Sequence, residues 1–371
     1  MSMFRLNDRE TADRIVRALK SMRLNVCLMH VCGTHQDTLV RYGLDSLLRD
    51  CGVTVRQGPG CPVCVTTMKE YEEAATLAKE GIAVATFGDA SRVPGQHGSL
   101  LDLRAEGCNV RIVYGIEDAV KIAEGTEKKV VFLGVGFETT APSTAVMVLK
   151  GLPKNFSILN CHRYVPPALN ALLGMGEVKL HGLIEPGHVS TIIGIKPYEE
   201  ISKRYKIPQV IAGFEPLDML MAVYMLACQI KNQEAKVENE YSRVVRYDGN
   251  VKALDALDRV FEPFDIDWRG FPIISESGMK LRKKYNGSDA RKVYADELKD
   301  VAQNMFEDRT DCRCGEVLRG LIDSTDCPLF GKGCTPTHPT GPCMVSMEGS
   351  CNIEFKYGTQ RKDKPTHTGH L

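Results

Sequence analysis

The sequence contains no long hydrophobic run and carries no net charge. Its longest apolar stretch, residues 219–228, has ten residues, about half of the ~20 that a membrane-spanning helix needs. Lys and Arg together number 47, and Asp and Glu together also number 47, so there is no basic excess to hold nucleic acid. The first twenty residues mix both charge signs and lack the apolar core of a secretory signal. We therefore expect a cytoplasmic protein that binds neither nucleic acid nor membrane.

Two common nucleotide-binding motifs are missing or incomplete. No Gly-x-x-x-x-Gly-Lys-Ser/Thr loop occurs, so a phosphate-binding loop of that type has no support. Gly134 and Gly136 follow an apolar run, but the third glycine of a dinucleotide fingerprint would fall at Thr139. We therefore do not expect NAD binding.

Short apolar runs alternate with helical patterns over the first 230 residues. The runs predict strands at 26–31, 53–55, 82–87, 110–114, 130–135, 156–159 and 210–212. The helical patterns predict helices at 11–20, 40–48, 66–79, 117–124, 142–150 and 217–230. This alternation is typical of an α/β fold with parallel sheets covered on both faces. From about residue 235 the chain becomes more charged and then rich in cysteine.

Cysteine is the most informative residue type, with 14 in the chain. In a reducing compartment, clustered thiols indicate metal or redox chemistry rather than a disulfide framework. Six of them fall within residues 312–351, namely Cys312, Cys314, Cys327, Cys334, Cys343 and Cys351.

A cysteine and a histidine three residues apart occur in Cys32-Gly-Thr-His35, after a predicted strand and before a helix. Open α/β folds place their ligand sites at this end of a strand. The two side chains can ligate a soft or borderline metal, or they can form a Cys–His nucleophile pair. The alternative without chemistry is a buried cysteine beside a surface histidine.

The segment Gly58-Pro-Gly-Cys61-Pro-Val-Cys64 also lies between a strand and a helix. Cys-x-x-Cys at a helix start lowers the pKa of the first thiol and permits a reversible disulfide. A structural zinc site would require a second Cys-x-x-Cys, and the chain has none. We therefore favour redox chemistry or transient ligation over zinc or an inert core.

The C-terminal cysteines lie in irregular sequence rich in glycine and proline, which is poor core material. A four-iron cluster needs four thiolates and tolerates irregular spacing. Four of six would leave two thiols free to form an exchangeable pair. Zinc is the alternative cofactor, and spacing alone does not choose the four ligands.

Five further acidic and histidine residues lie near predicted strand ends, where they can line a cleft. Each alone is more often a helix cap or a satisfied surface group. They are Glu138, His162, Glu185, His188 and Glu215.

Together these motifs resemble the HypD family of [NiFe]-hydrogenase maturation factors. The resemblance is carried by the two motifs above and by Gly134-Val-Gly-Phe-Glu138-Thr-Thr, Ala212-Gly-Phe-Glu215-Pro, Cys312-Arg-Cys314-Gly-Glu-Val-Leu-Arg-Gly, and the segments 327–336 and 341–351. It covers residues 10–357. One departure is Gln36, where many members carry Glu.

The resemblance implies two Rossmann-like lobes with parallel sheets and a C-terminal iron–sulfur domain. We place these parts at 1–127, 128–250 and 251–371. It also implies partners: the chaperone HypC, the cyanide donor HypE and the hydrogenase large-subunit precursor. The chain would be the scaffold on which iron acquires its cyanide and carbonyl ligands as Fe(CN)2CO.

The resemblance further implies a role for each motif. Cys32 would bind the iron, with His35 as a second ligand or proton donor. Cys61 and Cys64 would be a redox dithiol, and Cys314 and Cys343 an exchangeable pair beside the cluster. The ligands of the [4Fe-4S] cluster, by similarity to ferredoxin–thioredoxin reductase, would be Cys312, Cys327, Cys334 and Cys351.

Two other classes of protein fit parts of the sequence. An iron–sulfur thiol–disulfide oxidoreductase would reduce a generic disulfide without HypC. A zinc-bound interaction module would be colourless.

Overall fold

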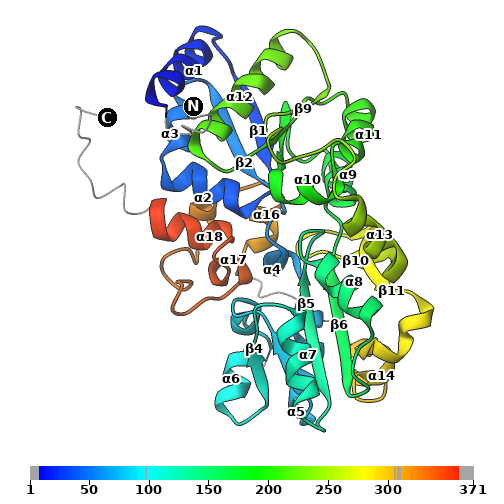
Figure 1. Cartoon of the computed structure of the whole chain (residues 1–371). Helices are drawn as coiled ribbons and strands as arrows, with labels where there is room; N and C mark the ends of the chain where they lie inside the picture. The colour runs from blue at the N-terminus through cyan, green and yellow to red at the C-terminus, as the bar shows by residue number, and fades with distance from the viewer. Residues whose placement is uncertain (1–7, 97, 305, 307–310, 359–371) are drawn as a thin grey trace.

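The structure, a computed structural model, describes residues 8–96, 98–304, 306 and 311–358. The N-terminal segment, residues 1–20, is predicted not to be a secretory signal, and its first seven residues lie outside the described part of the chain. The described chain is a mixed α/β protein whose two larger sheets are parallel throughout, which confirms the α/β prediction. Figure 1 shows the two sheets in separate lobes, with the C-terminal helices beside the junction between them.

The upper sheet in Figure 1 has the strand order β2-β1-β7-β8-β9. Every residue of β7 and β8 is buried, as expected when helices cover both faces. Its strands are β1 (Val26–His30), β2 (Val53–Gln57), β7 (Gly182–Pro186), β8 (Gln209–Ala212) and β9 (Val237–Asn239). Its helices are α1 (Arg9–Ser21), α2 (Gly33–Arg41), α3 (Leu44–Arg49), α10 (Gly187–Ile193), α11 (Lys196–Tyr205) and α12 (Pro216–Lys231).

The lower sheet has the order β4-β3-β5-β6. All residues of its two longest strands, β5 and β6, are buried. Its strands are β3 (Ala83–Thr86), β4 (Val110–Ile112), β5 (Val130–Gly136) and β6 (Phe156–His162). The helices of this region are α4 (Pro62–Val65), α5 (Met68–Lys79), α6 (Leu100–Ala105), α7 (Ile116–Glu124) and α8 (Ala141–Lys150). Helix α9 (Val165–Met175) follows β6 but lies beside α11 in the upper lobe (Figure 1).

The chain passes between the two sheets twice. It leaves the upper sheet after β2 through the short helix α4, and it returns after β6 through α9. Each of the predicted lobes, 1–127 and 128–250, therefore supplies strands to both sheets. The boundaries stay a prediction as domain limits, but neither segment forms a complete sheet alone.

The rest of the chain wraps around the junction. An antiparallel hairpin, β10 (Phe261–Asp267) and β11 (Ile273–Leu281), packs along β6 and α9. The C-terminal cysteines lie on and between very short helices. The helices of this part are α13 (Val251–Val260), α14 (Ala290–Val293), α15 (Lys299–Gln303), α16 (Cys314–Leu318), α17 (Pro342–Val345) and α18 (Ser350–Ile353).

Two arginines, Arg163 buried and Arg291 partly buried, join the lower sheet to these later segments. Arg163, which follows β6, pairs with Glu70 of α5 at 2.5 Å and donates to the Asp267 carbonyl at 2.8 Å. Arg291 of α14 pairs with Glu73, which also belongs to α5, at 2.7 Å. Because Arg163 and Glu70 are nearly inaccessible to water, the loss of either one would deprive a buried charge of its closest partner.

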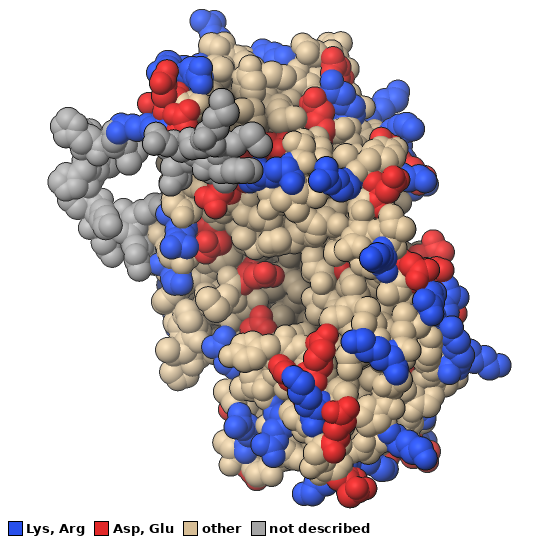
Figure 2. Space-filling view, viewed as in Figure 1, with Lys and Arg blue, Asp and Glu red and all other residues tan. Residues whose placement is uncertain are grey.

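The surface carries no broad patch of one charge on the face shown in Figure 2, where basic and acidic side chains are interspersed. No helix in the described part of the chain is long and apolar enough to cross a membrane.

We predict that Arg163→Met lowers the free energy of unfolding by about 3–5 kcal/mol, because the buried Glu70 would lose its closest cation and keep only Thr67 and the more distant Arg291 at 3.8 Å. Denaturant unfolding measures the change. The control is Arg259→Met, which breaks an exposed pair with Asp255 and should cost no more than about 1 kcal/mol. Equal losses in the two variants would contradict the prediction.

Candidate functional site

The predicted site begins at the carboxyl end of β1, where Cys32 immediately precedes helix α2. Cys32 and His35 are both buried. His35 Nε2 lies 2.9 Å from the Gly213 carbonyl and 3.3 Å from the Ala212 carbonyl. Because both partners are acceptors, Nε2 carries the proton and Nδ1 keeps its lone pair. Nδ1 is buried without a hydrogen-bond partner, so its lone pair is available to a metal, three residues after Cys32.

Burial determines the protonation of these groups. It lowers the pKa of His35 to about 3, helped by the neighbouring His30, so the imidazole is neutral as a metal ligand requires. Burial also raises the pKa of Cys32 to about 11, and the charge of Glu348 adds to this. Cys32 is therefore a thiol at neutral pH, and binding to a metal would release its proton.

Gln36, the residue that departs from the expected Glu, contacts His30 beside this site. Its Oε1 lies 2.8 Å from His30 Nε2. Since Oε1 is an acceptor, His30 donates from Nε2, and its Nδ1 faces the Cys32 N–H at 3.5 Å.

The Cys-x-x-Cys segment lies directly against Cys32. Cys61 and Cys64 are inaccessible to water and joined by a disulfide. A side-chain carbon on Gly60 would lie 2.2 Å from the Cys32 backbone nitrogen, so only glycine permits this approach. The fold therefore brings together the first two predicted motifs.

The C-terminal thiols reach the same place from the other side. Helix α17 packs on α4, and Cys64 Sγ lies 3.8 Å from the Pro342 carbonyl oxygen. The sulfurs of Cys314 and Cys343, the predicted exchangeable pair, lie 2.6 Å apart. Two pairs of sulfurs are thus adjacent through the packing of α4 against α17.

Helix α18 and the residues before it close the site over Cys32. Helix α18 packs on α2. A side-chain carbon on Gly33 would lie 2.5 Å from the Glu348 carbonyl oxygen. The Cys-Gly-Thr-His segment therefore accommodates the C-terminal part of the chain only because it has no side chain at this position.

The four cysteines predicted to hold the cluster lie in the same block. Cys327, Cys334 and Cys351 are buried and Cys312 is partly so. The Thr340 N–H donates to Cys334 Sγ at 3.2 Å. Burial raises the pKa of the Cys351 thiol. A side-chain carbon on Gly341 would lie 2.6 Å from Cys312 Sγ and 3.7 Å from Cys314 Sγ, so these two sulfurs border the same glycine.

Four buried or partly buried thiols are a donor set that an iron–sulfur cluster would take. Among the described residues, no three His, Cys, Asp or Glu side chains are arranged to hold one metal ion. A cluster takes one thiolate per iron over a wider space. Buried thiols and a backbone N–H donor to sulfur suit such a cofactor.

Arg269 is a residue of this site that we did not predict. It is buried, its backbone N–H donates to the Val65 carbonyl, and its guanidinium donates to the Thr66 carbonyl at the end of α4. Contact with Cys314 and burial raise the pKa of Cys312, and the Arg269 charge opposes this. Its position after the only tryptophan and before a glycine, in Trp268-Arg269-Gly270, is the one local signal.

The five acidic and histidine candidates near strand ends fall into two groups. Glu215 is the N-cap of α12, in a capping box with Asp218, and His188 stacks on Phe214 with ring centroids 3.8 Å apart. Glu138, His162 and Glu185 are buried, and each has at least one polar side-chain atom without a hydrogen-bond partner.

Comparison with known proteins gives a consistent result across the chain. Residues 8–358 match the family described as HypD, hydrogenase formation hypA family. The chain is 46% identical to a putative hydrogenase expression/formation protein of Methanocaldococcus jannaschii over 96% of this chain and 99% of that protein.

Two bacterial relatives have similar coverage. The hydrogenase maturation factor HypD2 of Bradyrhizobium diazoefficiens is 41% identical, covering 94% of this chain and 93% of the relative. The hydrogenase maturation factor HypD of Cupriavidus necator is 40% identical, covering 96% and 97%. With motifs, fold and relatives in agreement, the chain belongs to the HypD family of hydrogenase maturation factors.

Proposed function

We propose that this chain, together with HypC, is the scaffold on which an iron atom acquires cyanide and carbonyl ligands. HypE would supply the cyanide, and the finished Fe(CN)2CO unit would pass to the hydrogenase large-subunit precursor. The iron is cargo here rather than a resident cofactor. A cytoplasmic location follows from the same proposal.

One observation carries this proposal: the buried Cys32 lies against the Cys-x-x-Cys segment at Gly60, and His35 of the same motif keeps a buried Nδ1 without a hydrogen-bond partner. Soft thiolate and imidazole donors suit an iron that carries cyanide and carbon monoxide. Two protein ligands leave most of the coordination sphere open, so a cysteine of HypC can complete the site.

The adjacent dithiol supplies the redox chemistry of cyanide transfer. Cleavage of the carbon–sulfur bond in a thiocyanate-like group on HypE consumes two electrons and gives a thiolate and cyanide. Oxidation of Cys61 and Cys64 to the disulfide supplies those two electrons. The cyanide then binds the neighbouring iron.

The C-terminal block would restore the dithiol. Cys312, Cys327, Cys334 and Cys351 would hold a [4Fe-4S] cluster, which supplies electrons one at a time when bound. Cys314 and Cys343 would be the exchangeable pair between cluster and dithiol. Their place on α16 and α17, next to α4, supports this order.

The packing of two sulfur pairs against each other also favours a second function, that of an iron–sulfur thiol–disulfide oxidoreductase. A protein of that class would reduce a generic disulfide substrate at full rate without HypC. The proposed scaffold would not, because Cys61 and Cys64 are closed to water.

We predict that Cys32→Ala abolishes loading of the cargo iron into the complex with HypC and leaves the cluster absorbance unchanged. Anaerobic iron analysis and an absorbance spectrum measure both. The control is Cys51→Ala, which removes a buried thiol from the core beneath α3 and should change neither. Loss of the cluster in Cys32→Ala would refute the separation of the two sites.

We predict that Cys334→Ala eliminates the iron and sulfide of the cluster, whereas Cys314→Ala retains both. The reason is that Cys334 is a proposed ligand and Cys314 belongs to the exchangeable pair. Iron and sulfide assays on anaerobically purified protein measure the content. The opposite result would overturn the assignment of ligands.

A further inference from the structure

Gly213, between β8 and α12, accepts the ring proton of His35. His35 Nε2 donates to the Gly213 carbonyl at 2.9 Å and lies 3.3 Å from the Ala212 carbonyl. A larger residue does not fit here, since a side-chain carbon on Gly213 would lie 2.8 Å from Tyr241 Cδ2 and closer still to Asp218 Oδ2. Because glycine adopts a wide range of backbone angles, this carbonyl keeps its direction only if another group holds it.

Glu240, which directly follows β9, holds Gly213 from the side opposite His35. Glu240 Oε2 accepts the Gly213 N–H at 3.0 Å. This N–H and the Ala212 carbonyl belong to one planar trans peptide group, so they point in opposite directions. Glu240 and His35 therefore contact the two ends of the same peptide group, and printed hydrogen bonds lead from one side chain to the other.

Glu240 is itself held in place. Its backbone N–H donates to the Ile211 carbonyl of β8 at 3.0 Å, and its side chain is only 10% exposed. Arg243 lies 3.7 Å from Glu240 Oε1 and also pairs with the buried Asp218 of α12. The Arg243 guanidinium lies over the ring of Tyr241, 4.4 Å from its centroid. The carboxylate that holds Gly213 is thus confined by both backbone and side-chain contacts.

The residue after Gly213 packs on the helix that carries His35. Thr38 of α2 donates its hydroxyl proton to the Phe214 carbonyl at 2.6 Å. The centroid of the Phe214 ring lies 5.1 Å from that of His35 and 3.8 Å from that of the exposed His188. His35 therefore meets segment 212–214 through both its Nε2–H and its ring, so the orientation of the imidazole depends on where this segment lies.

We propose that Glu240 is a positioning residue that acts through the Ala212–Gly213 peptide group. It keeps the His35 proton on Nε2 and the Nδ1 lone pair available to a metal. This inference rests on the proposed function, in which His35 is a ligand of the cargo iron. A histidine ligand generally donates its other ring N–H to an acceptor that fixes its tautomer and orientation. Here that acceptor is a glycine carbonyl, and Glu240 supplies the rigidity that glycine lacks.

Two substitutions separate the hydrogen bond of Glu240 from its charge. Glu240→Gln keeps an oxygen that can accept the Gly213 N–H but removes the charge that faces Arg243. Glu240→Asp keeps the charge but is shorter by one methylene, so its carboxylate no longer reaches Gly213 from the same backbone position. The proposal assigns the effect to the hydrogen bond, so only Glu240→Asp should disturb His35.

Glu238 offers a matched control in the same strand. It lies two residues earlier, in β9, and its Oε2 accepts from Gln229 Nε2 of α12 at 2.8 Å. This hydrogen bond leads to the end of α12 rather than to Gly213. Glu238→Asp therefore measures what the loss of a carboxylate contact at this edge of the sheet costs by itself.

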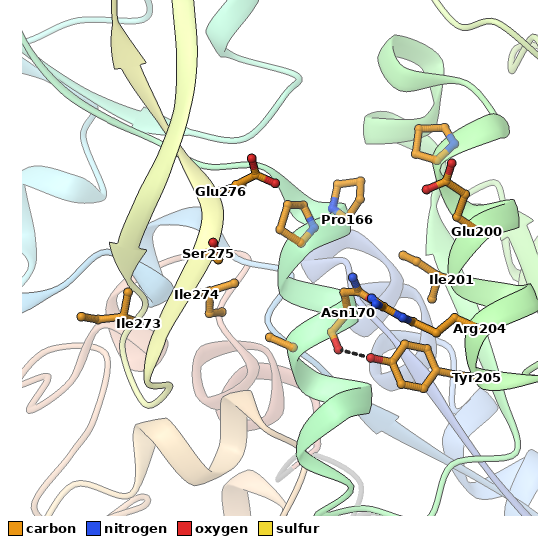
Figure 3. A pocket seen from close by; sticks show the side chains of 13 residues that line it. Pro166, Asn170, Glu200, Ile201, Arg204, Tyr205, Ile273, Ile274, Ser275 and Glu276 are labelled. Atoms are coloured by element: carbon orange, nitrogen blue, oxygen red, sulfur yellow. Dashed lines mark hydrogen bonds between the residues drawn. The ribbon is translucent and has the colours of Figure 1, made fainter.

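A second control removes a side-chain hydrogen bond to a backbone carbonyl elsewhere. Tyr205 donates its hydroxyl proton to the Asn170 carbonyl at 2.9 Å, in a cavity of 660 Å³ between α9, α11 and the β10–β11 hairpin (Figure 3). The lining of this cavity includes neither His35 nor segment 212–214. Tyr205→Phe should therefore leave His35 unchanged.

The first test uses the isolated full chain, purified without oxygen, and needs neither iron loading nor cyanide transfer. Nitrogen-15 NMR of histidine side chains distinguishes the two neutral tautomers, and His35→Gln identifies the His35 signals. We expect a single Nε2–H tautomer of His35 in wild type, Glu240→Gln and both controls, and a mixture in Glu240→Asp. An Nδ1–H tautomer in wild type, a mixture in Glu240→Gln, or an unchanged His35 in Glu240→Asp would overturn the proposal.

The second test measures Fe²⁺ affinity of the complex with HypC, by anaerobic competition with a chelator. Only the iron that Cys32→Ala fails to bind is counted. Loss of the outer hydrogen-bond partner of a metal ligand lowers metal affinity by about 10- to 100-fold. We expect this decrease for Glu240→Asp and wild-type affinity for Glu240→Gln and the two controls.

A general role in stability would give a different result. Equal decreases in iron affinity for Glu240→Asp and Glu238→Asp would indicate a loosened sheet edge and would overturn the specific role of Glu240. If wild type binds no more Fe²⁺ than Cys32→Ala, the proposed function fails, and the NMR test alone decides whether Glu240 positions His35.

Discussion

The site depends on one packing constraint: two parallel sheets meet at a junction to which the chain returns several times. Parallel strands bring their carboxyl ends to one edge. Cys32 therefore follows β1, Glu185 lies near the end of the neighbouring strand β7, and Glu138 follows β5 of the lower sheet. The first crossing between the sheets carries Cys61 and Cys64. No single segment contains the site, and the topology assembles it.

This assembly buries polar atoms without partners, which costs stability. An unsatisfied buried polar group costs about 1–3 kcal/mol, and His35, Glu138 and Glu185 all contain such atoms. Apolar neighbours of similar size would avoid the cost. The buried pair of Arg163 with Glu70 and the two apolar cores of the lobes hold the fold around the site, so a local cost can be tolerated there.

The sequence predicts most elements of both lobes, because their apolar runs and helical periodicities are strong. The prediction misses β7, since Gly182–Pro186 begins with glycine, ends with proline and contains only two consecutive apolar residues. Its partner β1 lies far upstream, so the sheet order cannot be derived from neighbouring segments. For the same reason each predicted lobe is one continuous segment of the sequence, whereas each sheet combines strands from both segments.

The site residues also divide into those that the local sequence reveals and those whose role depends on distant segments. Cysteine motifs are visible locally because their chemistry is rare. Glu138 and Glu215 have the same local context of strand, aromatic residue and acid, yet Glu138 is buried at the junction and Glu215 caps a helix at the surface. Arg269 stays unnoticed because its partners, the Val65 and Thr66 carbonyls, belong to a distant segment.

The final part of the chain completes the site through two neighbouring contacts. Glu348 occupies the space left by Gly33, and α17 brings Cys343 toward the helix that carries Cys61 and Cys64. Both contacts come from residues 342–353, which are too short and irregular to fold alone. Closure over Cys32 and alignment of the sulfur pairs are therefore coupled. A chain whose C-terminal block is not organised would lack both the covered Cys32 and the alignment of the two sulfur pairs.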